Sequence, residues 1–274
     1  MRSTRKITSA MKMVAAAKLH RTQREASALV PYSEELQRIV AHLSAGTHEE
    51  VVALATEREV RGVTIVGFAS NSTLCGAYNA NVGREVAAAR NTYSQLPPEG
   101  VRVVAMGKRL ATELTKLGVT FEEGDGALSE HPNYPDFRQM AEGLMADFLD
   151  RRTDRVELVY YKFHSAGKQE LVRERLLPIE LPEGSAENFQ DVDYILEPSR
   201  EELIATLLPR EVSLRLYTAA LSAIASEHAA RMVAMQAATD NADDLIGELS
   251  IEYNKQRQQA ITTELLDIVG GQSR

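Results

Sequence analysis

Apolar residues near the start of the chain recur every three or four positions, the spacing of an amphipathic helix with one apolar face. They are Ile7, Met11 and Val14, followed by Leu29, Tyr32, Leu36, Ile39 and Leu43. Between the two groups the same phase falls on Lys18, Arg21 and Glu25, so the middle of this face is polar. The pattern predicts a long helix that is not buried in an ordinary core, with a kink or a second start at Pro31.

A second helical pattern resumes after Pro198 and runs through Thr239, Asp240 and Asn241. Its apolar phase is carried by Tyr217, Leu221, Ile224, His228, Met232, Met235, Ala238, Ala242, Leu245 and Leu249. These positions advance by about 3.6 residues per step, which is the α-helical repeat. Thr, Asp and Asn usually prefer caps and turns. Here the unbroken phase predicts that a single helix continues through them, over about 211–268 and roughly 85 Å long.

Between the two helical regions the chain contains short runs rich in Val and Ile, typical of strands. Strands are predicted at 62–70, 101–107, 155–163 and 171–179, with helices between them at about 80–96, 108–118 and 134–151, and loops at 122–135 and 178–198. This alternation predicts a Rossmann-like α/β domain with an open, largely parallel sheet. We assign residues 58–199 to this domain and residues 1–57 and 200–274 to the two helices.

The length of the C-terminal helix requires a partner, because no domain of this size can bury it. The N-terminal helix is the only comparable element, and an antiparallel coiled coil is the simplest pairing. The acidic residues predicted to face the basic helix are Asp240, Asp243, Asp244, Glu248 and Glu252. Such exposed ion pairs contribute only about 0–1 kcal/mol each and set register more than stability. In the register we predict, Lys18 and Glu252 lie near each other.

Charge is distributed unevenly along the chain. The formal net charge is −8, which opposes general nucleic-acid binding, yet the first 24 residues contain several Lys and Arg and no acid. This composition also fits an organelle transit peptide, but the apolar pattern continues past it, which favours a helix of the mature protein. A nucleic-acid binder with a basic arm is a further alternative, opposed by the acidic C-terminal helix.

Motifs that would carry chemistry are weak. No glycine-rich phosphate-binding motif is present, and Gly107-Lys108-Arg109 lacks the spacing needed to hold a phosphate. The lone Cys75 excludes an internal disulfide and is interpreted as a buried or partner-facing residue. The six histidines lack metal-ligand spacing, and His228 is interpreted as part of the helix interface. We therefore predict no catalytic site, cofactor or metal. The alternative is a small-molecule-binding α/β domain with its ligand at the loop after Ser70.

Both ends of the chain closely resemble the γ subunits of F-type ATP synthases. The resemblance lies in KITSAMKMVAAAKLHRTQ, ASEHAARMVAMQAATDNADDLI and YNKQRQQAITTELLDIVGG. The internal stretches YKFHS, RLLP, EPSREEL and LLPREV are similar to landmarks of that family and occur in the same order. The resemblance covers essentially the whole chain.

The resemblance implies a rotor without an active site of its own. The terminal helices would form a shaft inside a hexameric head of α and β subunits, and the α/β domain would form a foot on the ε subunit and the membrane ring of c subunits. Proton flow would turn the ring and the shaft, and ATP would be made on β. The chain would associate peripherally with the cytoplasmic face of a bacterial plasma membrane. The matrix side of the mitochondrial inner membrane is the alternative.

The resemblance also implies roles for individual residues. Met11, with its neighbour Lys12, matches a position near an acidic moving loop of β. Arg231, Gln258, Thr262 and Glu264 match coupling positions, the last three where the terminal helices would meet near the head.

The foot loop with Leu74, Cys75 and Gly76 reads SNSTLCGA where the family usually resembles SDRGLCGG, so its contacts with ε or the ring are expected to differ. The chain also starts about a dozen residues later than family members, which predicts a short N-terminal helix. The extra cysteines of redox-regulated members are absent, so we expect no thiol switch.

Overall fold

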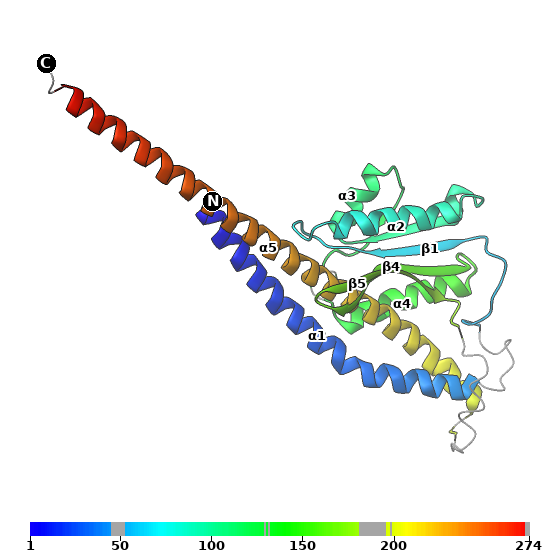
Figure 1. Cartoon of the computed structure of the whole chain (residues 1–274). Coiled ribbons are helices and arrows are strands. Elements are labelled where there is room, and N and C mark those ends of the chain that lie inside the picture. Colours follow the sequence, from blue (N-terminus) through cyan, green and yellow to red (C-terminus); the bar gives the residue numbers. More distant parts are fainter. Residues whose placement is uncertain (45–52, 129, 131, 181–195, 198, 272–274) are drawn as a thin grey trace.

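The computed structural model describes residues 1–44, 53–128, 130, 132–180, 196–197 and 199–271, without the side chains of residues 44 and 264–271. Two long helices, α1 (Arg2–Ser44) and α5 (Arg200–Gly271), run side by side and extend away from an α/β body (Figure 1). The end of α5 lies at the far end of the rod, beyond the start of α1 (Figure 1). We call the α1–α5 pair the shaft.

The body contains five strands and three α-helices between α1 and α5 in the described residues. These elements are β1 (Val63–Phe68), α2 (Tyr78–Thr92), a 3-10 turn η2 (Pro98–Gly100), β2 (Val101–Met106), α3 (Lys108–Lys116), β3 (Glu122–Glu123), α4 (Tyr134–Leu149), β4 (Arg155–Ser165) and β5 (Lys168–Leu177). The four predicted strands and three predicted helices are confirmed. The short β3 was not predicted, because two charged residues carry no apolar pattern.

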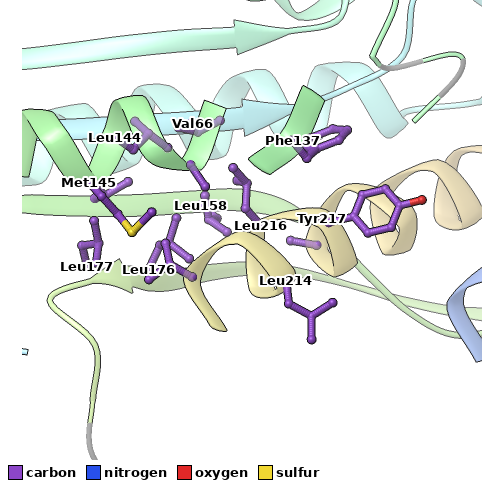
Figure 2. Close-up of a cluster of buried hydrophobic side chains, with 14 of the residues drawn as sticks. Val66, Phe137, Leu144, Met145, Leu158, Leu176, Leu177, Leu214, Leu216 and Tyr217 are labelled. Carbon is purple, nitrogen blue, oxygen red and sulfur yellow. The ribbon is translucent and has the colours of Figure 1, made fainter. Parts of the chain in front are cut away.

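The strands form one sheet in the order β3-β2-β1-β4-β5, parallel except for β5. Helices α2 and α3 cover one face of the sheet, and α4 with the first part of α5 covers the other (Figure 1). Figure 2 shows the second layer, where side chains from β1, α4, β4, β5 and α5 pack together. The open, largely parallel sheet confirms the predicted α/β class.

The β4–β5 hairpin extends beyond the parallel sheet. Strand β1 pairs with β4 only as far as Gly67 opposite Val159, whereas β4 and β5 stay paired from Val156 to Ser165. Residues 160–172 therefore form a two-stranded projection, which we call the arm. Figure 1 shows the turn of this hairpin beside α5.

The face of α1 that packs against α5 is a heptad seam. The buried and half-buried positions advance alternately by four and three residues, a mean of 3.5, as in left-handed coiled coils. They are Thr8, Lys12, Ala15, Leu19, Thr22, Ala26, Leu29, Ser33, Leu36, Val40 and Leu43. The predicted seam residues Ile7, Val14 and Tyr32 are instead more than half exposed. That part of the prediction was wrong, because small and polar residues, which carry no hydrophobic signal, fill the contact.

Helix α5 is longer than predicted. It begins at Arg200, where the Ser199 hydroxyl accepts a hydrogen bond from the Glu202 N–H at 3.2 Å as an N-terminal cap, and it continues through Pro209. Its predicted apolar phase is buried or half-buried from Tyr217 to Ala242, and it passes through Thr239-Asp240-Asn241 as expected. Leu245 and Leu249 are 43% and 56% exposed, because α1 begins opposite this point.

Two polar contacts fix the register of the shaft. The Thr239 hydroxyl donates to the Thr8 hydroxyl at 2.8 Å, and Arg5 forms an ion pair with Asp243 at 2.5 Å. In this register Lys18 lies opposite a residue near 229. The predicted proximity of Lys18 and Glu252 is therefore wrong by about 23 residues, or roughly 35 Å of helix. Only Asp243 of the five acidic residues forms a described ion pair with α1.

No helix in the described part of the chain is both long and apolar enough to cross a membrane.

One buried carboxyl group lacks a partner among the described residues. Glu211 of α5 is 7% exposed, its Oε2 atom has no hydrogen bond, and burial raises the pKa of its carboxyl. A carboxyl whose pKa is raised by folding loses stabilising free energy as pH rises from its unfolded value toward its folded value.

We therefore expect Glu211→Gln to increase the free energy of unfolding at pH 8, by about 1–3 kcal/mol. The gain should shrink as the pH falls below 4.5, where the carboxyl becomes neutral even in the unfolded chain. Urea unfolding followed by helical circular dichroism at several pH values measures this. Glu248→Gln, at an exposed position in the interior of the same helix, is the control and should change stability and its pH dependence little. An equal gain in the free energy of unfolding at pH 8 and at a pH below 4.5 would contradict the ionisation argument.

Candidate functional site at the junction of shaft and body

Helix α5 crosses the carboxyl ends of β1 and β4 where the shaft leaves the body. In open α/β sheets, ligands bind in the crevice at this edge, where neighbouring connections leave toward opposite faces. Here the connection after β1 leads to α2 on one face, while α4 and α5 cover the other face. The Tyr78 hydroxyl at the start of α2 donates to the Ala223 carbonyl of α5 at 2.8 Å. The shaft helix therefore occupies the place where many α/β folds hold a ligand.

Arg231 of α5 is tied to the loop that follows β1. One guanidinium nitrogen, Nη1, donates to the Glu227 carboxylate at 2.7 Å. The other, Nη2, donates to the Ser72 hydroxyl at 2.7 Å and lies 3.4 Å from the Thr73 carbonyl oxygen. The Arg231 and Glu227 side chains are only 11% and 9% exposed. We call these four residues the latch.

Burial controls the protonation of the groups in and beside the latch. It raises the pKa of Glu227, and the Arg231 guanidinium partly opposes this. Burial lowers the pKa of the neighbouring His228 to about 4, helped by the positive charges of Arg231 and Lys18. His228 is therefore a neutral, half-buried residue of the helix interface at neutral pH, as predicted.

The loop after β1 presents two of its three predicted contact residues. Leu74 is 52% exposed and held at φ +67°, and Gly76 is exposed at φ +60°. Cys75 is buried, with its sulfur 3.2 Å from Asn79 Nδ2 and 3.8 Å from the Ser70 hydroxyl, and burial raises its pKa. A thiol in this environment is neither exposed nor activated as a nucleophile.

A cleft of about 380 Å³ opens between α1, α5 and this loop. Its walls include Lys18, Arg21 and Glu25 from α1, Asn71 and Ser72 from the loop, and Glu227, His228 and Arg231 from α5. Arg21 pairs with Glu25 and Arg231 with Glu227, so most of the charge is balanced within the cleft. In the described part of the chain, no three His, Cys, Asp or Glu side chains are placed to hold a metal ion.

The remaining predicted site residues lie along the shaft. Met11 and Lys12 are half-buried on α1, near the upper end of the helix pair. Gln258 and Thr262 are exposed on α5, and the described part of α1 does not reach them. The helix backbone continues through Glu264, whose side chain lies outside the described residues.

In the structure Arg231 contacts the loop that contains Leu74 and Cys75. The sequence had placed Arg231 among the coupling residues and this loop among the foot contacts. Sequence reasoning also missed Glu227, Ser72 and Tyr78. Glu227 could have been found, because it precedes Arg231 by four residues, the spacing of a helical ion pair. Ser72 and Tyr78 carry no signal of a contact with a helix 140 or more positions away; the contacts to Arg231 and Ala223 span 159 and 145 positions.

Comparison with known proteins covers the shaft and the body together. The sequence matches the protein family described as ATP synthase over residues 1–273. The ATP synthase gamma chain of Bacteroides fragilis is 46% identical, over 98% of this chain and 94% of that protein. The ATP synthase gamma chain of Flavobacterium johnsoniae is 41% identical, over 98% of this chain and 93% of that protein.

Two solved structures share the fold. A chain of the Tetrahymena thermophila mitochondrial ATP synthase central stalk and c-ring aligns with a TM-score of 0.62 at 22% identity, covering 85% of this chain and 99% of that chain. A chain of the Euglena gracilis mitochondrial ATP synthase aligns with a TM-score of 0.56 at 19% identity, covering 97% of this chain and 94% of that chain.

Proposed function

This chain belongs to the ATP synthase gamma-chain family and is the rotor subunit of a central stalk, and we propose that its shaft turns inside a head of α and β subunits. In this proposal the β subunits make or hydrolyse ATP, and this chain is non-catalytic. Rotation driven by protons through a ring of c subunits reaches the head through the shaft.

The observation that carries the proposal is the exposed apolar surface of the two-helix shaft. Helix α5 has 72 residues and is roughly 108 Å long, and the helix pair extends away from the body (Figure 1). Where α1 and α5 are paired, Ile7, Met13, Val14 and Val233 are each more than half exposed. Apolar side chains exposed along a rod outside the body indicate contacts with other proteins. A surrounding ring of subunits covers these side chains and leaves the shaft free to turn.

The α/β body, with proposed limits at residues 58–199, forms the foot of the rotor. We propose that it binds the ε subunit and the c-ring, with Leu74 and Gly76 presenting the loop after β1. The complex then holds this chain peripherally at the membrane, on the cytoplasmic face in a bacterium. The bacterial source of the related gamma chains favours this location over the mitochondrial matrix.

We propose that the coupling residues act at different positions along the length of the shaft. Met11 and Lys12 face an acidic moving loop of β, and Gln258, Thr262 and Glu264 lie deeper in the head. Arg231 acts at the foot end through the latch.

Co-assembly tests the proposed function directly. The purified chain is expected to neither bind nor hydrolyse ATP, and its addition to α and β subunits of a related bacterium should give a stable, cooperative ATPase. Reconstitution with a c-ring sector should add ATP-driven proton pumping. Failure to assemble with α and β, or tight ATP binding by the chain alone, would refute the rotor role.

The position of Met11 can be tested with a matched neighbour. Met11→Lys is expected to preserve ATP hydrolysis but lower proton pumping per ATP, because the added charge would attract an acidic loop of β and resist rotation. Met13→Lys adds the same charge roughly 200° around the helix, on a face that is 63% exposed, and should affect coupling less. Pumping measured by a pH-sensitive dye in inverted vesicles, divided by the ATPase rate, gives the comparison. Equal losses in both variants would contradict a specific role for Met11.

A further inference from the structure

We propose that the β4–β5 arm carries torque from the sheet to both helices of the shaft at once. This inference rests on the proposed rotor function and concerns how force passes between foot and shaft. The arm residues that make the contact are Tyr161, Phe163 and Ala166, and the shaft residues are Leu19, Ser222 and Ser226.

The arm is long enough to act as a lever. Beyond the last pairing with β1 at Val159, β4 continues for six residues to Ser165, about 20 Å at 3.4 Å per residue. An isolated two-stranded ribbon is marginally stable. Contacts between the two strands hold this hairpin: Lys162 forms an ion pair with Glu174 at 3.2 Å, and His164 Nε2 is hydrogen-bonded to the Glu170 carboxylate at 2.9 Å.

The arm is also braced against α2. The Tyr161 ring stacks on the Tyr78 ring with centroids 4.9 Å apart, and the Asn81 amide donates to the Tyr161 hydroxyl at 2.8 Å. The arm therefore moves with α2 and α3, the helices on the face of the sheet opposite α5. A force on the foot then reaches the tip of the arm.

At its tip the arm grips α5 with two hydrogen bonds. The Phe163 N–H donates to the Ser222 hydroxyl at 2.7 Å, and the Ser226 hydroxyl donates to the Tyr161 carbonyl at 2.9 Å. These side chains stand one helical turn apart on α5 and meet alternate residues of one strand. Two bonds spaced along the helix resist both sliding and rolling of α5 against the arm.

An apolar contact extends the grip to α1. Leu19 of α1 packs with Ala225 and Ala229 of α5, all three buried, and Phe163 and Ala166 of the arm pack against this cluster. The alanines let the arm approach the helix pair closely. The arm tip thus touches a place where α1 and α5 meet, so torque applied there turns the pair and not α5 alone.

Rotor stiffness measures this role. We would assemble the chain with α and β subunits, immobilise the head, attach a bead to a cysteine replacing exposed Asn91 on α2, and record angular fluctuations while the head waits for ATP. If the arm and the embedded first part of α5 are two parallel supports of similar stiffness, removing one should increase the angular variance of the bead about twofold.

The variants remove the grip in two independent ways. Ser222→Ala deletes the acceptor for the Phe163 N–H, and Phe163→Ala deletes the packing of the arm against the cluster of Leu19, Ala225 and Ala229. Each should raise the variance while the ATPase rate at saturating ATP is retained, and the double variant should raise it further. Ser222→Thr keeps the hydroxyl and should restore wild-type variance. Lys168→Ala, at the exposed first position of β5, is the matched control.

The outcomes separate the arm from the rotor function. If the wild-type assembly rotates and the double variant, folded by circular dichroism, shows unchanged variance, the arm carries no torque and the proposal is refuted. If Ser222→Thr does not restore the wild-type angular variance, the part of the proposal that rests on the hydrogen bond is refuted. A wild-type chain that does not assemble or rotate would instead refute the rotor function itself.

Discussion

Arg231→Met is expected to destabilise the protein by about 3–5 kcal/mol, because it leaves the Glu227 carboxylate buried without its partner. The Arg231 and Glu227 side chains are 11% and 9% exposed, so water from the adjoining cleft replaces the lost ion pair only in part. The same substitution removes the donors to Ser72 and Thr73, which releases the loop after β1 from α5. We therefore expect lower coupling of ATP hydrolysis to proton pumping as well as lower stability.

Two further variants separate these effects. Adding Glu227→Gln to Arg231→Met removes the unpaired charge, so most of the lost unfolding free energy should return while the loop stays released and coupling stays low. Arg210→Met, an exposed arginine on the same helix, should change stability by less than about 0.5 kcal/mol. Urea unfolding and vesicle pumping assays give the two readouts. A stability loss for Arg231→Met no larger than that of Arg210→Met would contradict the buried-pair argument.

Thr8→Cys with Thr239→Cys is expected to form a disulfide that locks the shaft in its observed register. The two hydroxyl oxygens are 2.8 Å apart, so the two side chains point toward each other across the helix pair, as the two cysteines of a disulfide must. Closing a loop of this length stabilises the folded chain by up to about 5 kcal/mol in the chain-entropy view. The native Cys75 is buried and should not compete.

The control pair tests the register first predicted from charge. Lys18→Cys with Glu252→Cys should give no disulfide and no bismaleimide cross-link, since the two positions are roughly 35 Å apart along the helix pair. Non-reducing gel mobility, protease mapping and thermal unfolding with and without dithiothreitol report both pairs. Cross-linking at 18 and 252, or failure at 8 and 239 under oxidising conditions, would overturn the register of the shaft.

The latch illustrates which contacts a single sequence conceals. Glu227 and Arg231 share a helix, so their pairing follows from a spacing of four residues. Ser72 meets Arg231 only because the sheet brings the end of β1 under α5, across 159 positions of sequence. The grip of Ser222 and Ser226 on the arm is of the same kind, because a serine in a helix carries no sign of the strand that it will meet.

The sequence by itself determined the elements, because hydrophobic period is a local property. Alternation gave the strands and helices of the body, and a step of 3.6 residues carried α5 through Thr239-Asp240-Asn241 without a stop. It also required that two long helices pair, since neither could be buried alone. Tertiary structure decided their register and faces. The interface between α5 and the N-terminal half of α1 contains Ala15, Thr22 and the Thr8–Thr239 hydrogen bond, where Ile7 and Val14 had been expected. Close approach of two backbones favours small residues there, and small residues leave no hydrophobic pattern from which a register can be read.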